Sequence, residues 1–241
     1  MSGKMKVFIS VILAMGIGLI AYQPVMNYLV IPSALDDQYR YFDELTREEI
    51  TVNAERFSSP DQNQDELPDD ERFDFSAVES VETEDLQDAK LDHDAVVGSI
   101  VIPSVDVALP ILYGATHDNM MVGAGTMKPG QAMGEGNYAL SSHAVQNPGL
   151  LFTPIRHIEA GELMYVTDKE QVYVYEASYR EVIEPTRIEV IHDQADRRML
   201  TLISCHASDG SDRIVVQGDL VDVVSLENMD SEMKERLLQL K

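Results

Sequence analysis

Residues 201–220 read TLISCHASDGSDRIVVQGDL and contain two β-rich apolar runs separated by a polar loop. The first run ends at Cys205 and the second begins at Arg213, which is typical of two antiparallel strands joined as a hairpin. In such a hairpin, Cys205 and Arg213 lie together at the end that carries the loop. Cys205 is the only cysteine in the 241 residues, so its thiol has no partner for an intrachain disulfide.

Similar short β-rich segments extend outward from this hairpin and are separated by turn signals rich in Gly, Pro, Asn and Asp. The predicted strands are residues 96–102, 107–113, 137–142, 162–167, 171–179, 181–190, 197–205 and 213–224. Residues 117–125 and 149–161 are predicted to be short helical or turn inserts. About eight short strands with few helices between them favour an all-β fold, a closed barrel or a sandwich.

The N-terminal region contains an apolar stretch without a charged residue from Val7 to Ile31, preceded by Lys4 and Lys6. A bilayer core requires roughly 20 apolar residues in a helix, whereas the apolar part of a cleavable signal peptide has about 7–15 residues. The basic tip and the acidic residues that follow the stretch place the N-terminus in the cytoplasm. We therefore expect residues 1–32 to form a cytoplasmic tip and a signal anchor, with the remainder of a single-pass protein outside the cell.

Residues 33–94 are strongly acidic, with 21 Asp and Glu against 5 Lys and Arg, a formal charge of −16. The part DQNQDELPDDERFDF has little apolar surface to bury and is typical of disorder. Tyr39, Phe42 and Leu45 are spaced three residues apart and predict a short helix. We expect residues 33–94 to be a partly disordered extracellular linker that acts as a solvated spacer.

The folded part follows this linker, with a β domain at residues 95–225 and an amphipathic helix at 226–241. Residues 95–241 carry 21 acidic and 11 basic residues, a net charge of −10. This charge argues against nucleic-acid binding, which requires phosphates to be neutralised. The sequence contains none of the GxGxxG, GxxxxGK[ST] or HExxH motifs, and we predict no cofactor.

A cysteine nucleophile requires a proton shuttle, and six histidines compete for that role. Four of them are less suitable: His206 would point away from Cys205 if the strand continues, His93 lies in the acidic linker, and His117 and His192 lie in polar turns. We favour His143 over the alternative, His157, because His143 ends a predicted strand and opens a loop.

At this point the sequence resembles a known family. The motif TLISC, a loop and then RIVVQGDL are similar to the Cys and Arg signature of sortases, the membrane-anchored cysteine transpeptidases of Gram-positive bacteria. ALSSHAVQNPGLLFTPI resembles their histidine segment, and the resemblance extends over about residues 95–225. It implies a closed eight-stranded β-barrel, with Cys205 as the nucleophile, His143 as the general acid/base and Arg213 as the cation that stabilises the oxyanion or orients the substrate.

The resemblance also implies the reaction: cleavage of an LPxTG-type sorting signal between Thr and Gly through a thioacyl-enzyme. The acyl group would then pass to an amine of a cell-wall precursor, of the lipid II cross-bridge type. Ser204 stands where the family usually has threonine, and Ser142 precedes His143 where small residues are common. Both are predicted to border the substrate.

An N-terminal anchor without a C-terminal one resembles class A, the housekeeping type. No DPW or DPF lid motif occurs, which argues against the alternative of a pilin-polymerising sortase. A second alternative is a membrane-tethered cysteine peptidase that hydrolyses surface peptides, and a third is a binding module whose thiol is inert. Some sortases bind calcium through acidic loops, but no motif assigns such a site here.

Overall fold

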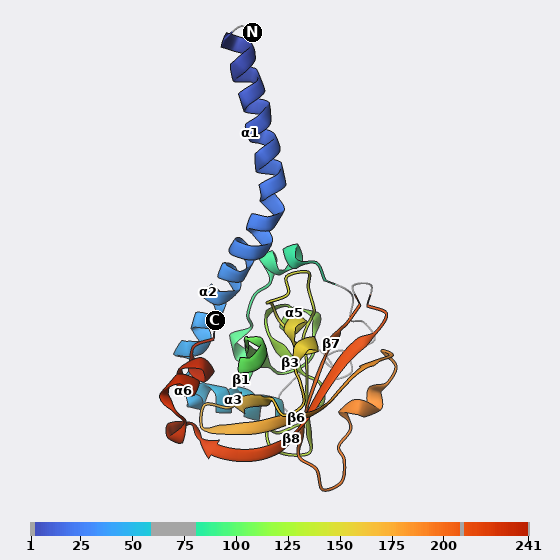
Figure 1. Ribbon diagram of the computed structural model, residues 1–241. Helices are drawn as coiled ribbons and strands as arrows, with labels where there is room; N and C mark the ends of the chain where they lie inside the picture. Colours follow the sequence, from blue (N-terminus) through green and yellow to red (C-terminus); the bar gives the residue numbers. More distant parts are fainter. Residues whose placement is uncertain (1–2, 59–80, 208–209, 241) are drawn as a thin grey trace.

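A computed structural model describes residues 3–58, 81–207 and 210–240 (Figure 1). Within this part of the chain, eight strands form a closed barrel in the order β1-β2-β3-β4-β7-β8-β6-β5. The strands are β1 (Val96–Ile102), β2 (Val107–Leu112), β3 (Ala124–Thr126), β4 (Asn137–Ser141), β5 (Leu163–Thr167), β6 (Gln171–Ile183), β7 (Met199–Cys205) and β8 (Arg213–Ser225). The predicted all-β class and the closed barrel are confirmed.

Two of the predicted strands were wrong in detail. Residues 171–179 and the start of 181–190 form one continuous strand, β6, which pairs with β8 along its whole length through two irregularities in register. The latter part of 181–190 contains instead the short 3-10 helix η6 (Ile188–Ile191). Strand β3 was missed because three residues, Ala-Gly-Thr, carry no readable alternation. The total of eight is therefore correct although one member differs.

Short helices connect the strands, and further helices, some of them longer, precede the barrel. Around the strands they are η3 (His93–Ala95), η4 (Pro103–Val105), α5 (His117–Val122), η5 (Thr153–His157), η7 (Leu226–Asn228) and α6 (Ser231–Leu238). Before the barrel they are α1 (Gly3–Val25), the π-helical turn η1 (Met26–Val30), α2 (Ile31–Glu44), α3 (Arg47–Ser58) and η2 (Thr83–Asp88). Helices α5 and η5 confirm the predicted inserts.

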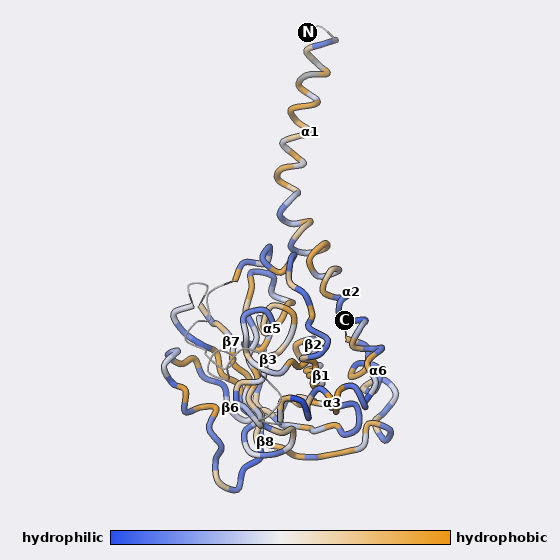
Figure 2. The backbone as a smooth tube through the Cα atoms, turned by 180° about the vertical axis from the view of Figure 1, so that it is seen from behind, coloured by the Kyte–Doolittle hydropathy of each residue, from blue (hydrophilic) through white to orange (hydrophobic). Residues whose placement is uncertain are grey.

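Helix α1 projects away from the barrel and is apolar on all sides (Figures 1 and 2). Its large side chains have no protein to pack against, as Leu19 and Ile20 show with 76% and 80% of their surface exposed. The stretch that begins at Ile9 is long and apolar enough to cross a membrane. The N-terminal apolar helix is thus compatible with a membrane anchor.

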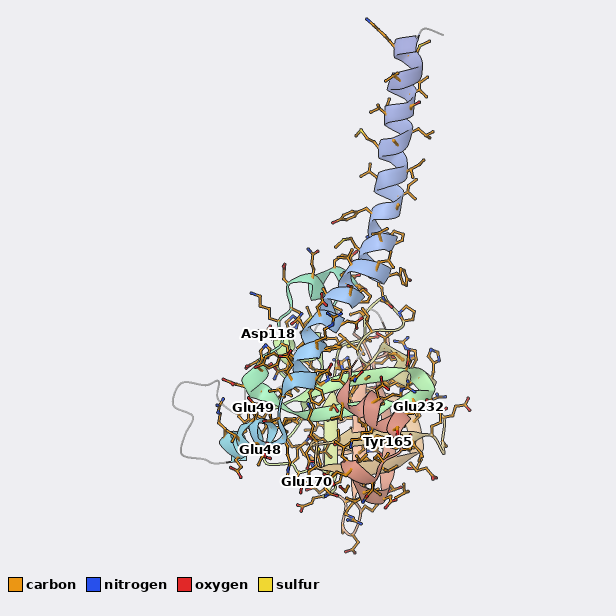
Figure 3. All side chains as sticks on the ribbon, turned by 90° about the vertical axis from the view of Figure 1, so that its left-hand side faces the viewer. Glu48, Glu49, Asp118, Tyr165, Glu170 and Glu232 are labelled. Atoms are coloured by element: carbon orange, nitrogen blue, oxygen red, sulfur yellow. The ribbon has the colours of Figure 1, made fainter. Side chains whose placement is uncertain are left out.

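Helices α2 and α3 pack on the barrel, which differs from the expected solvated spacer. Ile31, Leu35, Tyr39 and Phe42 are at most 4% exposed and join the main hydrophobic core. The spacing of three to four residues places them on one face of α2, so the predicted short helix is confirmed. The acidic side chains lie on the opposite, solvated face, as Glu48 and Glu49 do on α3 (Figure 3).

Lys169, in the turn between β5 and β6, binds the C-terminal end of α2 through hydrogen bonds. Its Nζ donates to the carbonyl oxygens of Phe42 and Leu45 and lies 4.1 Å from the centre of the Phe42 ring. A cation at this position donates hydrogen bonds to the free carbonyls at the helix end and interacts favourably with the negative end of the helix dipole. The expected disorder of residues 61–75 lies outside the described residues.

Candidate active site

Strands β4, β7 and β8 are neighbours in the barrel. The C-terminal ends of β4 and β7 and the start of β8 lie together at one edge. Strands β4 and β7 are parallel, and Ser141 is paired with Ile203. His143 is two residues after Ser141, and Cys205 is two residues after Ile203. His143 and Cys205 therefore lie at matching positions on neighbouring segments, which are about 4.8 Å apart in a sheet. On the other side of β7, Cys205 is paired directly with Arg213 of β8. The fold therefore places His143, Cys205 and Arg213 in one row.

Cys205 is the last residue of β7 and is 5% exposed. Burial raises the pKa of its thiol, the positive charge of Arg213 lowers it, and the negative charge of Asp212 raises it. Because burial is the largest of these effects, the neutral thiol is favoured in the resting protein.

His143 follows β4 and is 1% exposed. Its backbone is fixed on both sides, since its N–H donates to the Met120 carbonyl and its own carbonyl accepts from the Phe152 N–H. Burial, together with the charges of His117 and Arg213, outweighs a hydrogen bond with the His117 backbone and lowers the pKa of the imidazole to about 4. The ring is therefore neutral at pH 7, with one nitrogen as an N–H donor and the other able to accept a proton.

His117 was assigned to a polar turn, but it begins α5 and contacts His143 edge to face, with ring centres 5.1 Å apart. The sequence carries no signal for this contact, because His117 and His143 are 26 positions apart in the chain. The hydrogen bond from the His143 N–H to Met120 connects the same two elements.

Arg213 is 9% exposed, and the start of β8 holds it opposite Cys205. Its guanidinium Nη1 donates to the carbonyl oxygens of Gly210 and Asp212 at 2.8 and 3.0 Å. These bonds orient the side chain within the loop between β7 and β8. A charge held in this way can stabilise a negative oxygen without reorganisation.

Ser204 and Ser142 are buried and engaged with the backbone. The Ser204 hydroxyl donates to the Ser142 carbonyl at 2.8 Å, and the Ser142 hydroxyl donates to the Met120 carbonyl at 3.2 Å. The two side chains join β4, β7 and α5 next to the row of three residues. Their hydroxyls thus have partners within the protein.

A pocket of about 320 Å³ opens beside Cys205. It is lined by Val81, Glu82, Ala144, Val145, Gln146, Pro148, Thr153, Arg156, His157, Cys205, His206 and Ala207. His157, the alternative histidine, lies on its wall, whereas His143 is not among the lining residues. Val81 and Glu82, from the segment expected to be a spacer, were missed as part of the site. Within the described ranges, no group of three His, Cys, Asp or Glu side chains has the arrangement of a metal site.

The barrel brings a cysteine, a histidine and an arginine to one edge, and a thiol beside an imidazole is a pair of groups that nucleophilic acyl transfer can use. The sortase domain family model matches residues 100–221, and the chain belongs to the sortase family. Sortase A of Streptococcus agalactiae is 39% identical over 155 residues, which are 61% of this chain and 63% of that protein. The match therefore spans slightly less than two thirds of that relative.

Sortase A of Bacillus anthracis is 38% identical over 152 residues, covering 63% of this chain and 72% of that protein. Among solved structures, Listeria monocytogenes sortase A is 34% identical with a TM-score of 0.57, covering 61% of this chain and 99% of that one. All three relatives carry the name Sortase A, in agreement with the class A resemblance of the sequence.

Proposed function

We propose that this protein is a membrane-anchored cysteine transpeptidase that cleaves an LPxTG-type sorting signal between Thr and Gly and transfers the acyl part to an amine of a cell-wall precursor. The observation that supports it best is the row formed by His143, Cys205 and Arg213 at one edge of the barrel. A nucleophile, a proton shuttle and a cation are the three groups that such an acyl transfer requires.

In this proposal the Cys205 Sγ attacks the Thr carbonyl carbon while His143 accepts the thiol proton. The carbonyl oxygen becomes an oxyanion beside the Arg213 guanidinium. Collapse of this intermediate breaks the Thr–Gly bond, and His143 gives the proton to the leaving glycine nitrogen. The thioester then reacts with the acceptor amine, whose proton returns through His143 to the Cys205 sulfur.

A neutral Cys205 thiol and a neutral His143 imidazole in the resting protein suit this sequence of proton transfers. The low pKa of His143 keeps the imidazole free to accept a proton at neutral pH, and the raised pKa of Cys205 keeps the thiol protonated until the substrate arrives. Substrate binding then provides the geometry for a concerted transfer. Ser142 and Ser204, predicted to border the substrate, are better placed to hold the strand ends that carry His143 and Cys205, because their hydroxyls donate to backbone carbonyls.

Helix α1 would span the membrane once, with the N-terminus in the cytoplasm and the barrel outside the cell. The partners would be LPxTG-bearing surface proteins and the amine of a lipid II-type cross-bridge. The similarity to proteins named Sortase A supports both statements.

The test is incubation of the full chain in a non-ionic detergent with an LPxTG-type peptide, with and without triglycine, followed by mass spectrometry. We expect cleavage at Thr–Gly and a triglycine adduct, both lost in Cys205→Ala and strongly reduced in His143→Ala and Arg213→Ala. His157→Ala is the matched control for the alternative histidine and is expected to remain active. Hydrolysis without an adduct would favour the rival function of a tethered cysteine peptidase.

A further inference from the structure

The end of the apolar helix contacts the loop that follows His143. The Asn147 side-chain nitrogen Nδ2 donates to the Asn27 carbonyl at 2.6 Å, and the two residues are 7% and 9% exposed. One turn earlier on the helix, Gln23 Nε2 donates to Glu84 of η2 at 3.4 Å. The last turns of the apolar stretch are therefore in direct contact with the candidate active-site region.

The 3-10 helix η2 completes this connection from the other side. The backbone N–H of Asn147 donates to the Thr83 hydroxyl at 3.2 Å, and the Gln146 side chain donates to Glu82. Glu82 also lines the pocket that opens at Cys205. One set of buried and polar contacts thus joins the helix end, η2, the loop after His143 and the rim of the pocket.

The length of the apolar stretch determines the level at which these contacts lie. From Val7 to Ile31 there are 25 uncharged residues, which in a helix extend over about 37 Å, whereas a bilayer core is about 30 Å thick. Counted from Val7, next to the basic tip, the core ends about 20 residues later, close to Asn27. Tyr22 and Tyr28, which are 62% and 59% exposed, flank this level as tyrosines do at membrane interfaces.

The barrel has little freedom to move away from this level. Helices α1, η1 and α2 follow one another without a break in helical structure (Figure 1), and α2 is buried along one face against the barrel at Ile31, Leu35 and Phe42. A continuous helical segment therefore connects the apolar stretch to the barrel, where a flexible spacer was expected.

We propose that the barrel edge with Cys205 and His143 lies at the lipid headgroup level of the bilayer, and that the helix from α1 to α2 holds it there. This inference rests on the proposed function in one respect, namely that α1 spans the membrane. The site then suits a peptide that is itself retained at the membrane surface, and an acceptor amine carried on a lipid.

The chain contains no tryptophan, so single tryptophans can report depth in vesicles that contain brominated phosphatidylcholine. Gln87→Trp on η2 and Gly149→Trp after His143 place the probe at exposed positions, and a Cβ at Gly149 meets only Asn147 Oδ1, at 3.6 Å. Ala195→Trp is the matched control, because the exposed Ala195 precedes β7 at the end opposite Cys205, and a strand of this length is about 20 Å long.

We expect quenching by the bromolipid to be severalfold stronger at positions 87 and 149 than at position 195. Equal, weak quenching at all three positions in membrane-retained protein would overturn the inference. Cleavage of a soluble LPxTG-type peptide, measured on the same variants, verifies their folding. Loss of the protein from the vesicles on carbonate extraction would instead count against the membrane anchor, so the two failures are distinguishable.

A second variant tests the role of the helix. A six-residue Gly-Ser insertion between Val30 and Ile31 separates α2 from the apolar stretch. We expect quenching at position 149 to fall toward that at position 195, while cleavage of the soluble peptide is retained. Unchanged quenching after the insertion would show that the helix does not hold the barrel at this level, and would overturn that part of the inference.

Discussion

The buried His143 makes the stability of this protein dependent on pH in a predictable way. Its pKa is about 4 in the folded protein against 6.5 for an ordinary histidine. Between these values the unfolded chain binds the proton more readily than the folded one, so stability is lost as pH falls from 6.5 toward 4. A shift of this size corresponds to about 3 kcal/mol, of which about 2 kcal/mol is lost between pH 7 and pH 4.5.

The measurement is guanidinium denaturation of the full chain in a non-ionic detergent at pH 7 and pH 4.5, for wild type and His143→Gln. Carboxylates titrate in both proteins, so their contribution cancels in the comparison. We expect the wild type to lose about 2 kcal/mol more free energy of unfolding than His143→Gln over this range. His192→Gln, at an exposed position, controls for the removal of an imidazole as such. Equal losses in wild type and His143→Gln would refute the assignment of a buried, neutral imidazole.

Three further outcomes are expected. The rate of Cys205 alkylation by iodoacetamide should still rise with pH above 9, because burial raises the pKa of the thiol, and a plateau near neutrality would indicate a resting ion pair with His143. Arg213→Lys should retain more activity toward an LPxTG-type peptide than Arg213→Ala, which we expect to lower kcat by about 10²–10³-fold; equal losses would argue against stabilisation by charge. Phe42→Ala should lower the free energy of unfolding by about 3–5 kcal/mol because Phe42 is fully buried, whereas Val52→Ala, at an exposed position, should have little effect in the same denaturation assay.

Most strands of the barrel could be predicted from the local sequence. Strands β1, β4 and β7 are buried at every position, so they occur in the sequence as short, mostly apolar, β-rich runs between turn signals. The position of Cys205 and Arg213 at the loop end of the β7–β8 hairpin follows from the same pattern and from the short loop between them. Strand β3 was missed, and the extent of β6 was misjudged, because neither is determined by its own residues: each is defined by the neighbour with which it pairs.

The flanking segments show the limit of composition as a guide. Residues 33–58 carry many acidic side chains, which favoured a solvated spacer, but a few apolar residues such as Leu35, Tyr39 and Phe42 are enough to bury one face of α2. A high net charge does not prevent packing when the charges lie on the opposite face.

The sequence by itself determined the apolar N-terminal stretch, most of the β-rich strand segments and the candidate residues of the site, because these depend on neighbours within a few positions. Only the tertiary structure decided that α2 packs on the barrel, that His117 lies against His143, and that Glu82 borders the pocket at Cys205. Each of these contacts joins segments far apart in the chain. Their free energy depends on the closure of the whole barrel, which brings the surfaces together and compensates the entropy lost in ordering them.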